Sequence, residues 1–172
     1  MRGLYGKITK YSAEKIRKAY LCSHPYCCRP VKVNSEWRFC RRRGVLHVNE
    51  IAHGSMRIIH TSNLYVMCGW PTGDCHLGYF HEGHGTDETI GRRMMRLFAV
   101  KALFAEAVID EIKILMRGRR WWQPGMGTLE DEIEKLKNEM KSLMDTELER
   151  WQIEKRKYVS KLIGEEHGKN GH

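Results

Sequence analysis

The residues that most constrain this chain are its cysteines and histidines, because they are confined to one half of it. All six cysteines precede residue 76 and seven of the nine histidines precede residue 85, so these side chains belong to one structural unit. They are densest in residues 68–86, where two cysteines and three histidines are interspersed with five glycines and a proline. Closely spaced Cys and His are typical metal ligands. We therefore expect a metal-bound knuckle that joins a β-rich half to a helical half.

Two groups of residues can supply the four tetrahedral S and N ligands that zinc prefers. The first group is Cys68, Cys75, His81 and His84. The second is Cys22, either Cys27 or Cys28, and Cys40, with His24 or His47 as the fourth ligand. Neither spacing matches a common zinc-finger pattern, so the sequence leaves open whether the chain holds one zinc ion or two.

The spacing of His81 and His84 argues against a catalytic metal. The motif His81-Glu82-Gly83-His84 is one residue shorter than the HExxH motif of metalloproteases, so its histidines would not share a helical face. Gly83 and Gly85 also disfavour a helix here. The glycines follow neither the P-loop nor the dinucleotide-binding pattern. We therefore expect a structural metal site in a protein that is not an enzyme.

Positive charge is concentrated at the N-terminus. Residues 1–43 hold twelve Lys and Arg against two Glu, whereas the rest of the chain holds eighteen basic and nineteen acidic residues. The net charge of +9 therefore lies where a phosphate backbone is expected to bind. The predicted contacts with RNA or another nucleic acid are Lys15, Arg17, Lys18, Arg29, Lys32, Trp37, Arg38, Arg41, Arg42 and Arg43, with the Trp37 ring stacking on a base. The alternative is a solvated basic surface that improves solubility.

The N-terminal half is expected to combine a short helix with a thin antiparallel sheet. The helix is predicted near Ser12, with Ile16 and Tyr20 on one face. Prolines make residues 21–35 a loop. Short apolar runs broken by Gly, Ser and Asn in residues 36–68 are the pattern of a meander, and a sheet this thin needs a metal to stabilise it. The runs lie near Trp37, Val45, Met56 and Leu64.

The C-terminal half is expected to be helical. Apolar residues at spacings near 3.6 predict one long helix from Thr86 or Asp87 to about Arg117, packed on the sheet. A capping box at Thr128 and Asp131 predicts the start of a second helix, whose narrow apolar seam is typical of a coiled coil. That seam either forms a homodimer or folds back on residues 88–117.

The predicted fold class is therefore α+β: a small zinc-stapled antiparallel sheet packed on a long helix and followed by a coiled-coil helix. The predicted divisions are a basic Cys/His-rich module over 1–117, a hinge over 118–127, a coiled coil over 128–163 and a disordered tail over 164–172. Neither a signal peptide nor a membrane-spanning stretch is found, so we expect a cytoplasmic protein, and Arg41–Arg43 is a short form of nuclear-import signal.

This layout resembles the small cysteine-rich proteins of rod-shaped plant RNA viruses, of the hordei-, furo- and tobravirus type. The residues that carry the resemblance are Cys22, Cys27, Cys28, Cys40, Cys68-Gly69, Cys75, His81 and the heptads from Leu129. The resemblance implies zinc binding, RNA binding and suppression of RNA silencing in a host–virus interaction. The family's Cys-Gly-x-x-His box is absent, because Trp70, Pro71 and Thr72 follow Cys68-Gly69.

Two shorter segments resemble other families. The run from Cys22 to Pro30 is similar to the Cys-x-x-Pro-x-Cys-x-x-Pro loop of some HNH-type nucleases, with Lys32 where those nucleases carry a histidine. Residues 65–78 look like a strand and turn of lentiviral infectivity factors, from which no residue role is carried over. The expected function is thus zinc-stabilised RNA binding by an accessory protein. The main rival expectation is an adaptor that recruits a protein through its helices. A degenerate HNH-like nuclease is a minor alternative.

Overall fold

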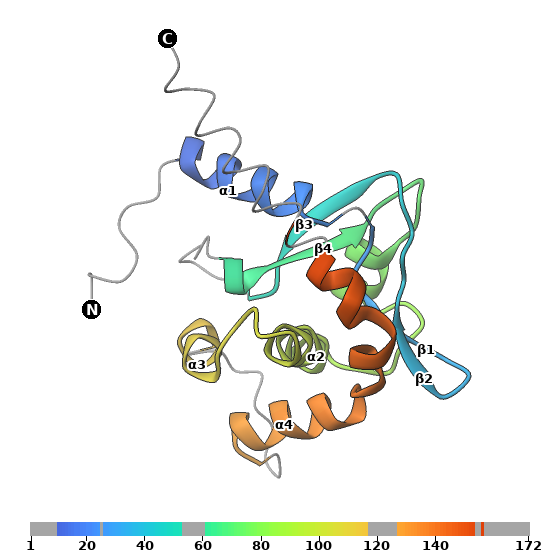
Figure 1. Cartoon of the computed structure of the whole chain (residues 1–172), viewed down its shortest axis with the longest axis vertical. Coiled ribbons are helices and arrows are strands. Elements are labelled where there is room, and N and C mark those ends of the chain that lie inside the picture. The colour runs from blue at the N-terminus through green and yellow to red at the C-terminus, as the bar shows by residue number, and fades with distance from the viewer. Residues whose placement is uncertain (1–9, 25, 53–60, 117–126, 154–155, 157–172) are drawn as a thin grey trace.

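The computed structural model describes residues 10–24, 26–52, 61–116, 127–153 and 156, and its architecture is α+β (Figure 1). Two separate two-stranded antiparallel sheets combine with helices, which confirms the predicted fold class at this level. Within these ranges, no helix is long and apolar enough to cross a membrane. The strand predicted near Met56, almost all of the hinge and the tail lie outside the described residues.

The first sheet pairs β1 (Pro30–Val33) with β2 (Glu36–Phe39). Asn34 and Ser35 join them with φ values of 49° and 67°, as a two-residue type I′ turn requires. The loop predicted over 21–35 is therefore wrong at Pro30–Val33, where proline begins a strand instead of preventing one. Trp37 and Phe39 are both buried, and they alternate along β2 with the exposed Glu36 and Arg38.

The second sheet pairs β3 (Leu46–Glu50) with β4 (Leu64–Cys68), which follows the short 3₁₀ helix η1 (Thr61–Asn63). Helix α1 (Lys10–Cys22) packs on this sheet and confirms the predicted N-terminal helix. Its residues Ile16 and Tyr20 share the face that contacts Leu64 and Val66. The expected single meander is thus divided into two separate two-stranded sheets, and α1 packs on the second of them.

The long helix predicted over 86–117 is wrong, because the chain breaks it in two. Helix α2 (Ile90–Leu103) begins after Thr89, whose hydroxyl accepts from the Arg92 amide, and α3 (Ile109–Met116) follows a turn. In that turn Ala105 takes a φ of 55°, and the Lys101 carbonyl accepts from the amides of Glu106 and Ala107.

The Lys101 side chain fixes the end of α2. Its ammonium is buried and donates to the Tyr20 hydroxyl and to the carbonyls of Thr61 and Leu64 at 2.8–2.9 Å. These bonds tie α2 to α1, η1 and β4. A buried charge is tolerated because several oxygens surround it.

Helix α4 (Leu129–Glu139) starts with the predicted capping box of Thr128 and Asp131. The chain turns near Met140 and is helical again over 142–153. The seam is buried in the same core as α2, with Ile133, Leu136, Met140, Leu143 and Trp151 all at least nine-tenths covered. It therefore packs within the chain, and α4 lies alongside α2 in Figure 1. A coiled coil is not confirmed, and the dimer through 128–163 remains a prediction.

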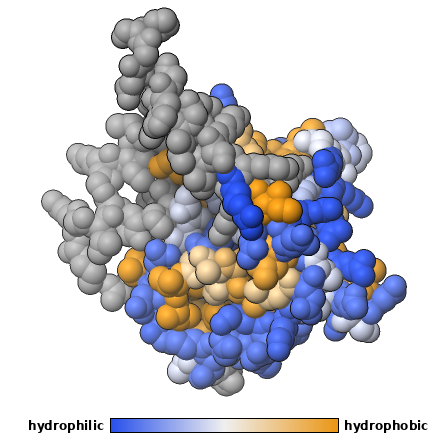
Figure 2. Space-filling view, in the orientation of Figure 1, coloured by the Kyte–Doolittle hydropathy of each residue, from blue (hydrophilic) through white to orange (hydrophobic). Residues whose placement is uncertain are grey.

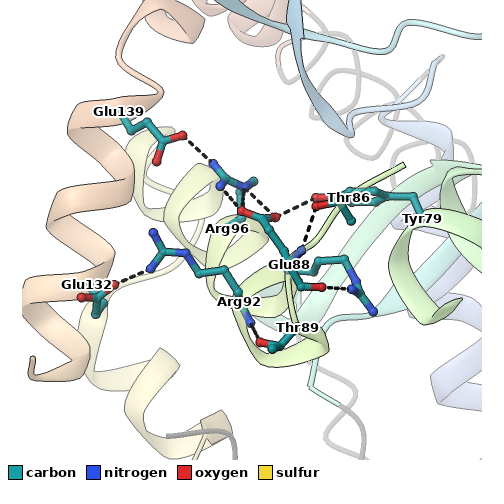
Figure 3. A network of polar contacts seen from close by, with 9 residues as sticks. Tyr79, Thr86, Glu88, Thr89, Arg92, Arg96, Glu132 and Glu139 are labelled. Carbon is teal, nitrogen blue, oxygen red and sulfur yellow. Dashed lines mark hydrogen bonds and ion pairs between the residues drawn. The ribbon is translucent and has the colours of Figure 1, made fainter. Parts of the chain in front are cut away.

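Ion pairs reinforce the contact between α2 and α4 (Figure 3). Arg92 pairs with Glu132, and Arg96 pairs with both Glu88 and Glu139. The Arg96 guanidinium also lies 4.7 Å from the centroid of the Trp37 ring, so β2 is fixed against the same helix.

Candidate metal centre

Four cysteine side chains from four separate segments meet in the structure. Cys27 lies between α1 and β1, Cys40 follows β2, Cys68 ends β4, and Cys75 begins the π-helix η2 (Cys75–Glu82). All four sulfur atoms lie within 4.8 Å of one another. None of the six cysteines forms a disulfide, so these thiols are free to bind a metal ion. The set can hold a metal ion, as the sequence predicts.

Backbone hydrogen bonds place these cysteines. The Cys27 amide donates to the Arg42 carbonyl, the Arg41 amide donates to the Cys27 carbonyl, and the Cys40 amide donates to the Arg29 carbonyl, each at 2.9 Å. This ladder sets Cys27 opposite Arg41 and Arg42 and sets Arg29 opposite Cys40, which brings the Cys27 and Cys40 side chains to the same site. The Cys28 amide donates to Val66 in β4 at 3.0 Å, which brings the end of that strand, and hence Cys68, to the same point.

The turn between Cys68 and Cys75 needs a glycine at position 73. A Cβ atom built there would lie 2.6 Å from the Cys68 sulfur and 2.7 Å from Nη1 of Arg42. Real Cβ atoms do not approach other heavy atoms so closely. Gly73 is thus a packing requirement of the metal centre.

Three of the four thiols are buried, and they share protons. Hydrogen bonding with Cys27 lowers the pKa of Cys40 and that of Cys68 below the ordinary thiol value. The pKa of Cys27 is raised in return, first by its hydrogen bond to Cys40. Nη1 of Arg29 donates to the Cys75 sulfur at 3.5 Å, so a guanidinium faces the thiolates. A divalent cation bound here would replace the protons of these thiols and stabilise all four thiolates together.

Four of the eight predicted metal ligands are outside this set. Cys22 is exposed near the end of α1, and Cys28 is buried with its thiol directed to the Tyr26 carbonyl. His81 has Nε2 3.4 Å from His76, and His84 has Nε2 3.0 Å from a carboxylate oxygen of Glu82. The two predicted groups therefore contribute two cysteines each to one site.

The histidines considered as fourth ligands also lie elsewhere. His24 is buried between the rings of Tyr20 and Trp151, with centroid distances of 4.5 and 4.8 Å. Nδ1 of His47 lies 3.0 Å from Nδ1 of His76. The four-cysteine set thus takes no histidine.

A cavity of about 220 Å³ opens beside Cys40 and Cys75. Its wall includes Arg29, Arg42 and Tyr79, with the Arg29 guanidinium 4.0 Å from the centroid of the Tyr79 ring. Nε of Arg29 is buried and has no hydrogen-bond partner among the described residues. The cavity thus combines two arginines with an aromatic ring beside the thiolates.

The predicted nucleic-acid contacts fall into several environments. Trp37 is buried, so its ring is not exposed for stacking. Arg17 pairs with Glu50, Arg38 with Glu36 and Arg41 with the buried Glu147. Arg38 is nevertheless exposed, as are Lys15, Lys18, Lys32, Arg42 and Arg43, and Arg29 is half-buried at the cavity.

Two aromatic residues without a predicted role lie near these arginines: Tyr79, buried in the cavity wall, and Trp70. Trp70 is 82% exposed in the turn between Cys68 and Cys75. Its position among glycines and a proline was the only signal in the sequence that it would lie in a turn.

No protein-family model, curated protein or solved structure matches this chain.

Proposed function

We propose that the metal is zinc. Four thiolates placed tetrahedrally around zinc at about 2.3 Å have sulfur–sulfur distances of about 3.8 Å. The sulfurs of Cys40 and Cys75 are 3.8 Å apart. A closed set of four cysteines is typical of structural zinc, which supports a stabilising role over a catalytic one. Metal analysis of protein purified without chelator should give one equivalent of zinc, and less than about half an equivalent would contradict the proposal.

We also propose that the protein is a non-enzymatic RNA-binding protein whose zinc centre holds the contact surface. The observation that carries this proposal is that Arg29 and Arg42 line the cavity beside Cys40 and Cys75, with Arg43 next to Arg42 in the chain. Arg42 and Arg43 are exposed, and no ion pair involves them among the described residues. Cationic side chains without acidic partners are suited to phosphate oxygens. Lys15, Lys18 and Lys32 extend the positive charge.

Fluorescence anisotropy with labelled RNA tests this function. The affinity should fall steeply as salt rises, because bound phosphates release counterions. Replacing Arg42 and Arg43 together by Ala should weaken binding and reduce the salt slope by about two. The matched control is the double replacement Lys135→Ala and Lys141→Ala, which removes the same charge from exposed positions in the C-terminal helical segment. Affinity that is independent of salt, or equal losses in the two double variants, would contradict the proposal.

The resemblance to the plant viral proteins extends the proposal to suppression of RNA silencing in the cytoplasm. A silenced reporter gene should regain expression when the protein is supplied. The Arg42→Ala, Arg43→Ala variant should lose this effect while the lysine control retains it. If the variant still restores reporter expression after losing RNA affinity, suppression of silencing does not depend on RNA binding.

A second candidate function is that of an adaptor, and exposed apolar residues beside α3 favour it. Val108 is 60% exposed and Ile114 is 41% exposed. Figure 2 shows a band of hydrophobic residues over α2 and α3, above the hydrophilic surface of α4. In that case Val108→Ser and Ile114→Ser should abolish binding of a protein partner, and RNA affinity should be absent at low salt.

A further inference from the structure

The most exposed large hydrophobic side chain of the described residues is that of Trp70, at 82%. Its backbone is nevertheless fixed. The Gly69 amide donates to the Val45 carbonyl at 3.0 Å, and the Gly73 amide donates to the Gly69 carbonyl at 3.0 Å. Both ends of the turn also carry a cysteine of the metal centre. An indole held in water on an anchored turn is available to a ligand.

The turn that presents Trp70 packs directly against the segment that carries Arg42 and Arg43. The Val45 amide donates to the Thr72 hydroxyl at 2.7 Å. A Cβ atom built on Gly73 would lie 2.7 Å from Nη1 of Arg42, so this guanidinium packs on the turn. The turn that carries Trp70 and the Arg42 guanidinium therefore belong to one surface, built from two neighbouring loops.

The same surface leads into the cavity beside Cys40 and Cys75. At about 220 Å³ it is smaller than the roughly 300–1,000 Å³ of pockets that enclose a small molecule. Such a cavity fits a phosphate group better than a whole nucleotide. Arg29 and Arg42 line the cavity and supply guanidinium groups as charge-assisted donors. Asp74 also lines the cavity, and its carboxylate accepts from the Gly78 amide and lies 3.5 Å from His84.

We propose that this surface binds single-stranded nucleic acid, with one base stacked on Trp70 and a phosphate of the same strand in the Arg29–Arg42 cavity. The proposal rests on the RNA-binding function and specifies the form of the ligand. A single strand is required because stacking on an indole needs an unpaired, unstacked base, whereas a duplex presents phosphates and groove edges.

The test compares a labelled short single-stranded RNA with its duplex, using the zinc-loaded full chain. Trp70→Ala should weaken single-strand binding by about 5- to 150-fold, the range that corresponds to loss of one stacked base. Trp70→Phe should restore most of the affinity, because it keeps an aromatic face. Leu77→Ala is the matched control, since Leu77 is also exposed, at 57%, but is aliphatic. Duplex affinity should change little in all three variants.

The cavity is tested separately with Arg42→Gln, which should reduce the single-strand salt slope by about one. Zinc content and far-UV spectra confirm that each variant is folded. Equal single-strand affinities for Trp70→Ala and Leu77→Ala would overturn the stacking proposal, while the loss in the Arg42→Ala, Arg43→Ala variant would leave the RNA-binding function standing. Equal losses on single strand and duplex would also overturn it. Loss of a protein partner with unchanged RNA affinity would assign Trp70 to an adaptor surface instead.

Discussion

Substituting Gly73 by alanine should weaken metal binding without touching any ligand residue. The added Cβ would stand 2.6 Å from the Cys68 sulfur, whereas ordinary contacts begin at 3.4 Å, so the sulfur must move by about 0.8 Å. The other close neighbour is Arg42, whose flexible guanidinium can move away. Metal–ligand distances tolerate about 0.2 Å, so this displacement exceeds the tolerance several-fold. We expect zinc affinity to fall by at least about 10- to 100-fold, the effect of disturbing residues that orient a ligand.

Competition with a chromophoric zinc chelator measures that change. Spectra of the cobalt-substituted protein show independently whether four thiolates still bind. The matched control is Gly127→Ala, because the new Cβ would meet only Asp131 at an ordinary 3.4 Å. The reasoning would be refuted if Gly73→Ala bound zinc as tightly as Gly127→Ala with an unchanged cobalt spectrum.

Three further predictions concern the metal and the fold. Cys40→Ser should abolish stoichiometric zinc binding in metal analysis, whereas Cys22→Ser should retain it because Cys22 lies outside the centre. Lys101→Met should lower the free energy of unfolding in urea by about 3–5 kcal/mol, since it removes the donor to the Tyr20 hydroxyl and to the carbonyls of Thr61 and Leu64 and the cation that pairs with Glu106, whereas Lys141→Met on the surface should change it little. Ala105→Gly should raise that free energy by about 0.5–1 kcal/mol, because its φ of 55° suits glycine; an unchanged urea midpoint would contradict this.

Residue types and spacing were sufficient to predict that cysteines gather into a set that can hold a metal ion, but not which cysteines do so. Cys27 and Cys28 are adjacent, and their side chains have different surroundings. Cys27 joins the metal centre, whereas the Cys28 carbonyl accepts from the buried Tyr65 hydroxyl and its thiol turns to the Tyr26 carbonyl. The choice depends on pairing with Val66, a contact between distant segments that local spacing does not reveal.

The helices illustrate the same limit. Local chemistry predicted the capping box at Thr128 because its two hydrogen bonds join residues three apart. The break after Leu103 depends on Lys101 reaching Tyr20 and Thr61, which are remote in sequence. Periodicity alone therefore predicts one continuous helix, whereas tertiary contacts impose a turn after Leu103.

Aromatic residues were the hardest to assign. Trp37 alternates with basic residues, which suggested an exposed stacking ring, yet Arg96 covers it in the core. Whether a tryptophan is buried depends on the elements that pack against its strand or turn. The local sequence around Trp37 and Trp70 does not contain that information.

The four-cysteine centre also has a consequence for how the chain folds. Its ligands are spread from residue 27 to residue 75, so the site does not exist until three intervening loops have closed. Each closure costs chain entropy, and a bound ion offsets it in the way a cross-link would. The free energy of metal binding thus becomes free energy of folding. Removing the ion with a chelator should release both hairpins and the arginine-bearing loop together, so that metal supply governs the whole surface as one cooperative unit.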